Sequence, residues 1–204
     1  PARSSPWKPP GERARQREVK RDAVILAAAH AFKERGYHNT TLDDIAAFLN
    51  VTKPTIYYYL TNKEQILFEC FKAGLDQIKA AFTELEGSQS PGREKIITLM
   101  RRYAEVIASE FGWCMVTVEE QDLSPAMSKR IKALKSEIDQ GMRKLIEEGI
   151  QDGSIRECDP KMTAFALAGA LNWVGHWYRR NDSLTPAQIA DRFIDVFVDG
   201  LRPR

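Results

Sequence analysis

The sequence predicts an all-α protein in which a small N-terminal domain of three helices precedes a larger helical domain. Three observations favour this class. Apolar residues recur at intervals of three and four, which is the helical period, and rarely at intervals of two. Clusters of Val, Ile and Thr, which are typical of strands, are short. Capping and stop signals divide the chain into eight or nine helical segments.

The first expected helix runs from about Val19 to Arg35. Val24 and Phe32 fall on one face of it, and Gly36 supplies a left-handed stop after its last residue. Residues 1–12 hold four of the ten prolines together with Gly and Ser, so we expect a flexible basic arm there. The arginines and lysines that follow would either contact DNA phosphates or solubilise the chain.

A second, short helix is expected to begin at Leu42. Thr41 can cap it, with the carboxylate of Asp44 in its favourable first turn. Asn50 suits the left-handed position that ends this helix, because asparagine tolerates positive φ better than most residues. Val51 is expected to bury its side chain in the turn that follows.

The third expected helix starts after Thr52, which can cap it, with Pro54 in the first turn, where a missing N–H does no harm. Ile56 and Leu60 define its inner stripe. The other side chains turn outward, and an exposed face of hydroxyls and a cation on the second helix of a tight pair is typical of a recognition helix in a DNA major groove. An ordinary helical hairpin with a Tyr-rich face is the alternative. The outward-facing set comprises Lys53, Pro54, Thr55, Tyr57 and Tyr58.

Further helix signals follow to the end of the chain. Asn62, with Gln65 three residues later, opens a long helix that should end near Gly87. Another amphipathic helix lies beyond the loop 87–92, and the chain is expected to break again around Gly112. Three more helices should start at Ser124-Pro125, Asp159-Pro160 and Thr185-Pro186 and reach about Gln151, Arg180 and Leu201.

The segment TTLDDIA, followed by LNVTKPTIYYYLTNK, resembles the N-terminal domain of the TetR family of transcriptional regulators, as does the preceding AAxAFKERGY pattern. The resemblance covers about the first quarter of the chain. It implies that Thr41 contacts the DNA backbone, that Tyr57, Tyr59 and Lys63 grip phosphates, and that Thr52, Lys53, Thr55 and Tyr58 lie at or near base edges. Asn50 stands where many members have Gly. The DNA-binding set is therefore Thr41, Thr52, Lys53, Pro54, Thr55, Tyr57, Tyr58, Tyr59 and Lys63.

We therefore expect a helix-turn-helix domain over residues 13–62 and an effector-binding and dimerisation domain over residues 63–204. A single helix-turn-helix covers one half-site, so a palindromic operator calls for a homodimer. The last two helices are the expected contact, although they could instead merely close the monomer core. Their small and apolar side chains are Ala164, Ala166, Ala168, Gly169, Ala170, Ile189, Phe193, Val196 and Phe197.

The resemblance also implies a cavity for a small effector in the larger domain. Its candidate lining residues are Phe71, Met100, Tyr103, Trp113, Trp173 and Trp177, although core packing is the alternative reading of each. The run NWVGHWYR at 172–179 is similar to TetR-family regulators of lipid or steroid catabolism that sense acyl-CoA thioesters. We therefore expect a large, mainly apolar effector of that class and a ligand-responsive repressor.

The charge distribution agrees with a DNA-binding first domain and an effector-binding second domain. Residues 1–63 carry 11 Lys and Arg against 6 Asp and Glu, a net charge of +5, while the remainder carries 19 against 22, a net charge of −3. Such an asymmetry indicates that the N-terminal third meets a polyanion. A solvated basic tail would give the same bias.

Several other classes are disfavoured. No apolar run reaches the roughly 18 residues of a transmembrane helix, and the basic N-terminus has no apolar segment behind it, so we expect a cytoplasmic protein without a membrane partner. Three dispersed cysteines and three dispersed histidines predict neither a metal site nor a cofactor, and no nucleophile motif indicates an enzyme. An architectural DNA-binding protein without an effector would not require so large a second domain.

Overall fold

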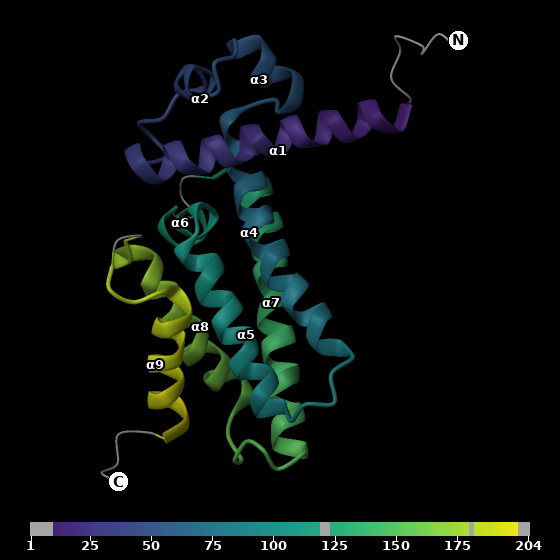
Figure 1. Cartoon of the computed structure of the whole chain (residues 1–204), viewed down its shortest axis with the longest axis vertical. Coiled ribbons are helices and arrows are strands. Elements are labelled where there is room, and N and C mark those ends of the chain that lie inside the picture. The colour runs from purple at the N-terminus through teal and green to yellow at the C-terminus, as the bar shows by residue number, and fades with distance from the viewer. Residues whose placement is uncertain (1–9, 119–122, 180–181, 200–204) are drawn as a thin grey trace, which may run out of the picture. The chain divides into compact units, whose positions relative to one another are not determined.

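The computed structural model describes residues 10–118, 123–179 and 182–199, and these ranges hold nine α-helices and no strand (Figure 1). The predicted all-α class is confirmed. The chain divides into two compact units, Pro1–Glu69 and Cys70–Arg204. Among the helices described, none is long and apolar enough to cross a lipid bilayer.

The first unit contains α1 (Pro10–Arg35), α2 (Leu42–Phe48), α3 (Lys53–Tyr59) and the first residues of α4 (Lys63–Glu86). The predicted start of the first helix, at Val19, is wrong by nine residues. Residues 11–20 are all exposed, so they carry no apolar stripe for a periodicity argument to detect, yet Glu, Arg, Gln and Lys are good helix formers. Residues 10–12 of the expected arm are therefore helical, and the rest of that arm lies outside the described residues.

The core of the first unit lies where α1, α2 and α3 meet. Phe32, Ile45, Ile56 and Leu60 are fully or almost fully buried there, as the predicted inner stripes require. Gly36 ends α1 at φ 82°, a conformation that glycine adopts without strain. The buried Thr40 hydroxyl ties the following loop back to α1, since it lies within hydrogen-bond distance of the Gly36 and Ala31 carbonyl oxygens.

The second unit is organised around α5 (Gly92–Ala108), which packs against each of the four later helices (Figure 1). The last three of those helices begin where their predicted caps place them. Ser124 and Asp159 accept hydrogen bonds from first-turn backbone N–H groups, and Thr185 and Gln188 form a reciprocal capping box. The four helices are α6 (Glu110–Thr117), α7 (Pro125–Gln151), α8 (Pro160–Trp177) and α9 (Pro186–Asp199).

The predicted break around Gly112 is wrong, because the chain turns at Ser109 instead. The Ser109 hydroxyl accepts a hydrogen bond from the Gly112 N–H and caps α6. Gly112 lies inside that helix, where a Cβ would come within 2.0 Å of the Ile107 carbonyl oxygen. Glycine is required there for close approach of two backbones, and not to end a helix. Near the C-terminus, α8 ends at Trp177 and short of the expected Arg180, while the expected end of the last helix at Leu201 lies outside the described residues.

Candidate nucleic-acid interface

Hydrogen bonds of short sequence separation fix the start of α2. The Thr41 side chain accepts from the Asp44 N–H, and the Asp44 carboxylate accepts from the Thr41 N–H at 2.8 Å, which completes a capping box. Asp44 also pairs with Arg35 at the end of α1, at 2.9 Å. The hydrogen bonds from Thr41, helped by the charge of Arg35, hold the pKa of Asp44 below its ordinary value.

The turn between α2 and α3 depends on Asn50. Its φ of 53° confirms the left-handed conformation that the sequence predicts. The Val51 N–H then donates to the Ala46 carbonyl at 3.0 Å, so the backbone satisfies its own hydrogen bonds through the turn. The expected burial of Val51 is wrong: its side chain is 37% exposed, because the tight turn leaves it on the outside.

The helix α3 presents its hydroxyls outward, as predicted. Thr52 occupies the N-cap position but makes no side-chain cap, and its hydroxyl instead lies 3.0 Å from that of Thr55. Ile56 faces the core, whereas Tyr57 and Tyr58 are 49% and 63% exposed. Large side chains that stay exposed on one helix face are typical of a binding surface.

Lys53, a predicted base-edge residue, has a carboxylate partner in the same motif. Its Nζ donates to Asp43 Oδ2 at 2.7 Å, across the turn from α2. The hydrogen bond and charge of Asp43 raise the pKa of Lys53, so the side chain stays charged. Both groups are exposed, and such a pair contributes little to stability.

The basic N-terminal part of α1 reaches the recognition face through Arg17. Its guanidinium lies over the ring of Tyr58, 5.2 Å from the centroid, which is within the range of a cation–π contact. Tyr58 in turn meets Tyr59 edge to face at 4.9 Å. The position of Arg17 does not follow from the predicted helix, because that helix was expected to begin only at about Val19.

Lys63 begins α4 and contacts the loop after α1. Its Nζ donates to the His38 carbonyl oxygen at 3.2 Å and lies 4.4 Å from the centre of the Tyr37 ring. Partial burial lowers the pKa of this lysine. The predicted Asn62 cap of α4 is confirmed, because the Gln65 N–H donates to the Asn62 side chain at 2.8 Å.

All nine predicted DNA-binding residues lie in the first unit, and none of them is buried. Asp43 and Tyr37 were not predicted as neighbours of that set, and Arg17 was expected only as one of several basic residues that contact DNA or solubilise the chain. The run of helix-forming residues before Val19 was the sequence signal that could have placed Arg17 on α1. The Asp43–Lys53 pair spans ten residues and follows only from the angle between α2 and α3, which local patterns do not give.

Of the predicted effector-binding residues, in contrast, one lines the cavity described in the second unit. Met100 lines a cavity of about 530 Å³ in the second unit, but none of the other five does. Phe71 and Tyr103 are buried in the core, and burial raises the pKa of Tyr103 to about 12 although its hydroxyl donates to Asn172 at 3.0 Å. Trp113 is half-buried elsewhere, while Trp173 and Trp177 lie exposed on α8.

Two family models match the chain and together cover most of it. The model described as "Bacterial regulatory proteins, tetR family" matches residues 24–70. The model described as "Tetracyclin repressor-like, C-terminal domain" matches residues 89–201, which is more than half of the chain. The first match includes α2 and α3, and the second includes the cavity.

Similar proteins agree over nearly the full length. The transcriptional repressor KstR2 of Rhodococcus jostii is 25% identical over 95% of this chain and 96% of its own. The structure of PfmR, a TetR-family regulator from Thermus thermophilus, has a TM-score of 0.81 at 25% identity over 88% of this chain and 99% of its own. AibR, solved with isovaleryl coenzyme A and operator DNA, has a TM-score of 0.76 at 26% identity over 87% of this chain and 97% of its own.

Proposed function

Since the chain belongs to the TetR family of DNA-binding transcriptional regulators, we propose that it represses transcription as a homodimer on a palindromic operator and is released by a small, mainly apolar effector. The observation that carries the proposal is the exposed face of α3. Hydroxyls of threonine and tyrosine gather there on a helix whose opposite face is fully buried, so the face is held rigidly enough to read DNA.

Different residues of this face have different roles in the proposal. Tyr57, Tyr59 and Lys63 would contact phosphates, which positions the protein without reading sequence. The carbonyl of His38 and the ring of Tyr37 already orient the Lys63 ammonium, which supports a role as a fixed grip. Thr41, at the start of α2, would contact the DNA backbone as well.

In the proposal, the side chains that read the bases belong to α3 and to its N-cap residue. Thr52, Lys53, Thr55 and Tyr58 would lie at or near base edges in the major groove, where hydroxyls and cations meet nitrogen and oxygen acceptors. Pro54 gives this turn a fixed backbone without losing a hydrogen bond. Arg17, stacked on Tyr58, would extend the phosphate contacts beyond the recognition helix.

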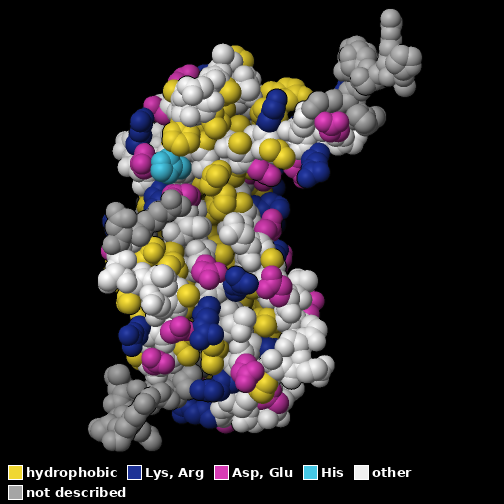
Figure 2. Space-filling model, viewed as in Figure 1, with side chains coloured by type: hydrophobic (Ala, Val, Ile, Leu, Met, Phe, Trp, Pro, Cys, Tyr) yellow, Lys and Arg dark blue, Asp and Glu magenta, His cyan; other side chains and the backbone are white. Residues whose placement is uncertain are grey.

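The homodimer would form through α8 and α9. Large apolar side chains on these helices remain exposed within one chain, which favours a protein partner over solvent. Small residues on the same two helices, such as Gly169, would let the helices of two chains approach closely. Charges of both signs are interspersed over the second unit on the face that Figure 2 shows. The exposed set comprises Met162, Phe165, Trp173, Trp177, Val196 and Phe197.

The effector class is proposed from the neighbours. AibR was solved with isovaleryl coenzyme A, and the cavity of about 530 Å³ in this chain has the size of a small-molecule site. An acyl-CoA or a related apolar thioester would then shift the conformational equilibrium away from the operator-binding state.

The test is selection of bound fragments from the source genome, followed by binding measurements on the enriched site. We expect enrichment of a palindrome and an affinity that falls steeply with salt. Tyr57→Phe should weaken binding to all sequences alike, whereas Thr55→Ala should relax specificity at particular bases. Tyr178→Phe makes the same chemical change outside the interface and should alter neither property. Failure to enrich any sequence would refute the proposal.

A further inference from the structure

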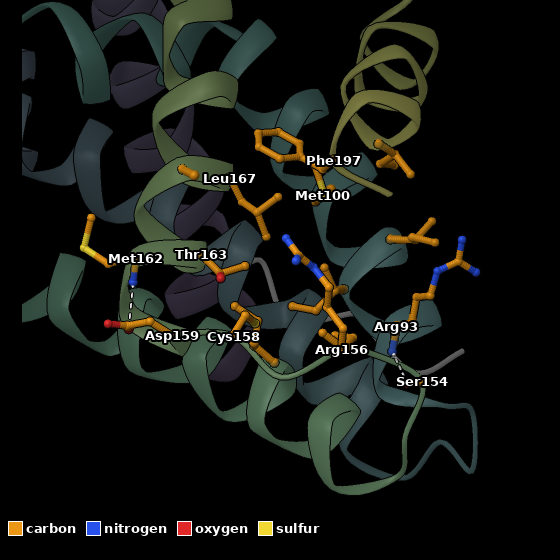
Figure 3. Close-up of a pocket in the computed structure, with 16 residues that line it drawn as sticks. Arg93, Met100, Ser154, Arg156, Cys158, Asp159, Met162, Thr163, Leu167 and Phe197 are labelled. Carbon is orange, nitrogen blue, oxygen red and sulfur yellow. Dashed lines mark hydrogen bonds between the residues drawn. The ribbon is translucent and has the colours of Figure 1, made fainter. Parts of the chain in front are cut away.

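The cavity of the second unit is built from α5, α7, the loop between α7 and α8, and the helices α8 and α9 (Figure 3). Its walls are largely aliphatic, and its volume of about 530 Å³ falls within the roughly 300–1,000 Å³ of small-molecule sites. The principal apolar side chains are Ile96, Ile97, Met100, Ile146, Leu167 and Ile194. An aliphatic or alicyclic group could replace water there with a gain in free energy.

Two guanidinium groups break this apolar lining. Figure 3 shows the Arg156 side chain pointing into the cavity, toward the side where Leu167 and Met100 lie, while Arg93 stands at its edge. Neither guanidinium has a hydrogen-bond or ion-pair partner among the residues that the structure describes. Both side chains are exposed to solvent overall, but a guanidinium without a partner beside apolar walls offers paired donors to the charged end of an anionic ligand.

The one acidic side chain among the lining residues described is already engaged. The Asp159 carboxylate accepts hydrogen bonds from the Lys161 and Met162 N–H groups, at 2.9 and 3.1 Å, and so serves as the cap of α8. It therefore does not neutralise the guanidiniums through a direct contact. The charge in the cavity remains positive, and it complements an anion.

The loop that carries Arg156 is held in place by the start of α5. Asp152 accepts from the Gly92 N–H at 2.7 Å, and the Ser154 hydroxyl accepts from the Arg93 N–H at 3.0 Å. Gly153 takes the positive φ of 76° that the bend needs. A site whose backbone is fixed before the ligand arrives loses less entropy on binding.

We propose that this cavity binds a small amphipathic anion, in which an aliphatic chain carries a carboxylate or phosphate group that pairs with Arg156. The inference rests on the effector-responsive function proposed above and names the ligand chemistry and the place where it binds. The anion could come from a free carboxylic acid or from the phosphates of a thioester carrier, and the titrants below distinguish these sources.

The experiment is calorimetric titration of the full chain, without DNA, with octanoate, octanol and octanoyl-CoA. We expect octanoate to bind at least about tenfold more tightly than octanol, since a charge-assisted hydrogen bond is worth about a factor of ten or more. Arg156→Gln should remove that preference. Arg102→Gln removes an exposed guanidinium outside the cavity and should leave all three affinities unchanged.

A second variant tests the contribution of the cavity volume separately from that of the arginine charges. Thr163→Phe fills the lining from α8 and keeps both arginines, so it should weaken octanoate and octanol alike. Retained helical content by circular dichroism would show that the variant folds. Binding of octanoyl-CoA alone, lost in Arg156→Gln, would support the site with phosphate as the anion.

Three results would overturn the inference: equal binding of octanol and octanoate, unchanged binding in Arg156→Gln, or no binding of any titrant. A dimer that dissociates in Thr163→Phe, without ligand binding in the parent chain, would show that a second copy fills the cavity. Operator selection with the same ligand-free protein is a separate readout. Its failure would refute the repressor proposal while leaving the cavity result standing.

Discussion

Both the helix-turn-helix and the second unit contain local caps, but their longest side-chain hydrogen bonds span very different lengths of chain. Within the helix-turn-helix, Thr41 bonds to Asp44, three residues apart, and Lys53 to Asp43, ten residues apart. In the second unit, Gly92 bonds to Asp152 and Tyr103 to Asn172, 60 and 69 residues apart. A recognition surface of this kind can be assembled largely by local rules, whereas a cavity requires the whole unit to be packed. The following predictions test this contrast, beginning with the largest effect.

Gly112→Ala should lower the free energy of unfolding of the second unit by about 3 kcal/mol, because the new Cβ would overlap the backbone of Ile107. Urea unfolding followed by hydrogen exchange and mass spectrometry would assign the loss to peptides of α5 and α6. Gly11→Ala, with open space around its Cβ, should be neutral or slightly stabilising. An equal loss of hydrogen-exchange protection in α2 and α3 would contradict this contrast, since the two units would then unfold together.

Thr40→Val should destabilise the first unit by about 2 kcal/mol. The buried Thr40 hydroxyl donates to the Gly36 carbonyl at 2.9 Å and lies 3.2 Å from that of Ala31, and valine leaves these acceptors without it. Exchange in peptides of α1 and α2 measures the effect. The exposed Thr83 provides a matched control, and Thr83→Val should change stability by less than about 0.5 kcal/mol. Similar effects at both positions would contradict the assignment.

Asn50→Ala should cost about 1 kcal/mol, because alanine is strained at the φ of 53° that the turn requires. Asn50→Gly keeps the conformation accessible and should stay close to the parent protein. Thermal unfolding compares the three proteins. If alanine and glycine were equivalent, the turn would relax without strain, and local backbone geometry would matter less than we infer.

The smallest expected effect is on the pH dependence of stability at low pH. The pKa of Asp44 is lower in the folded protein than its ordinary value of 3.8, so its contribution to stability is present above that value and is lost as pH falls through the folded pKa. Asp44→Asn should therefore reduce the difference in urea midpoint between pH 6 and pH 3. An unchanged difference would mean that the capping box does not couple to folding.

The same contrast explains what the sequence could and could not predict. The caps at Thr41, Asn62 and Ser124 and the left-handed Asn50 are set by neighbours within a few residues, and all were predicted. The cavity draws on α5, α7, the loop after α7, α8 and α9, so its arginines carried no local signal, and aromatic residues were expected there instead. Trp173 and Trp177 were expected to line the effector cavity or to pack in the core, but both lie exposed on α8.

The Asp43–Lys53 pair has a consequence for the search of a chromosome. A regulator meets very many random sites for each operator, so its occupancy depends on the ratio of specific to nonspecific affinity. Lys53 donates to the Asp43 carboxylate at 2.7 Å, and the negative charge of Asp43 beside it would repel DNA phosphates. On the proposed recognition surface, Asp43 would therefore lower the nonspecific affinity for DNA and shorten the time spent at nonspecific sites.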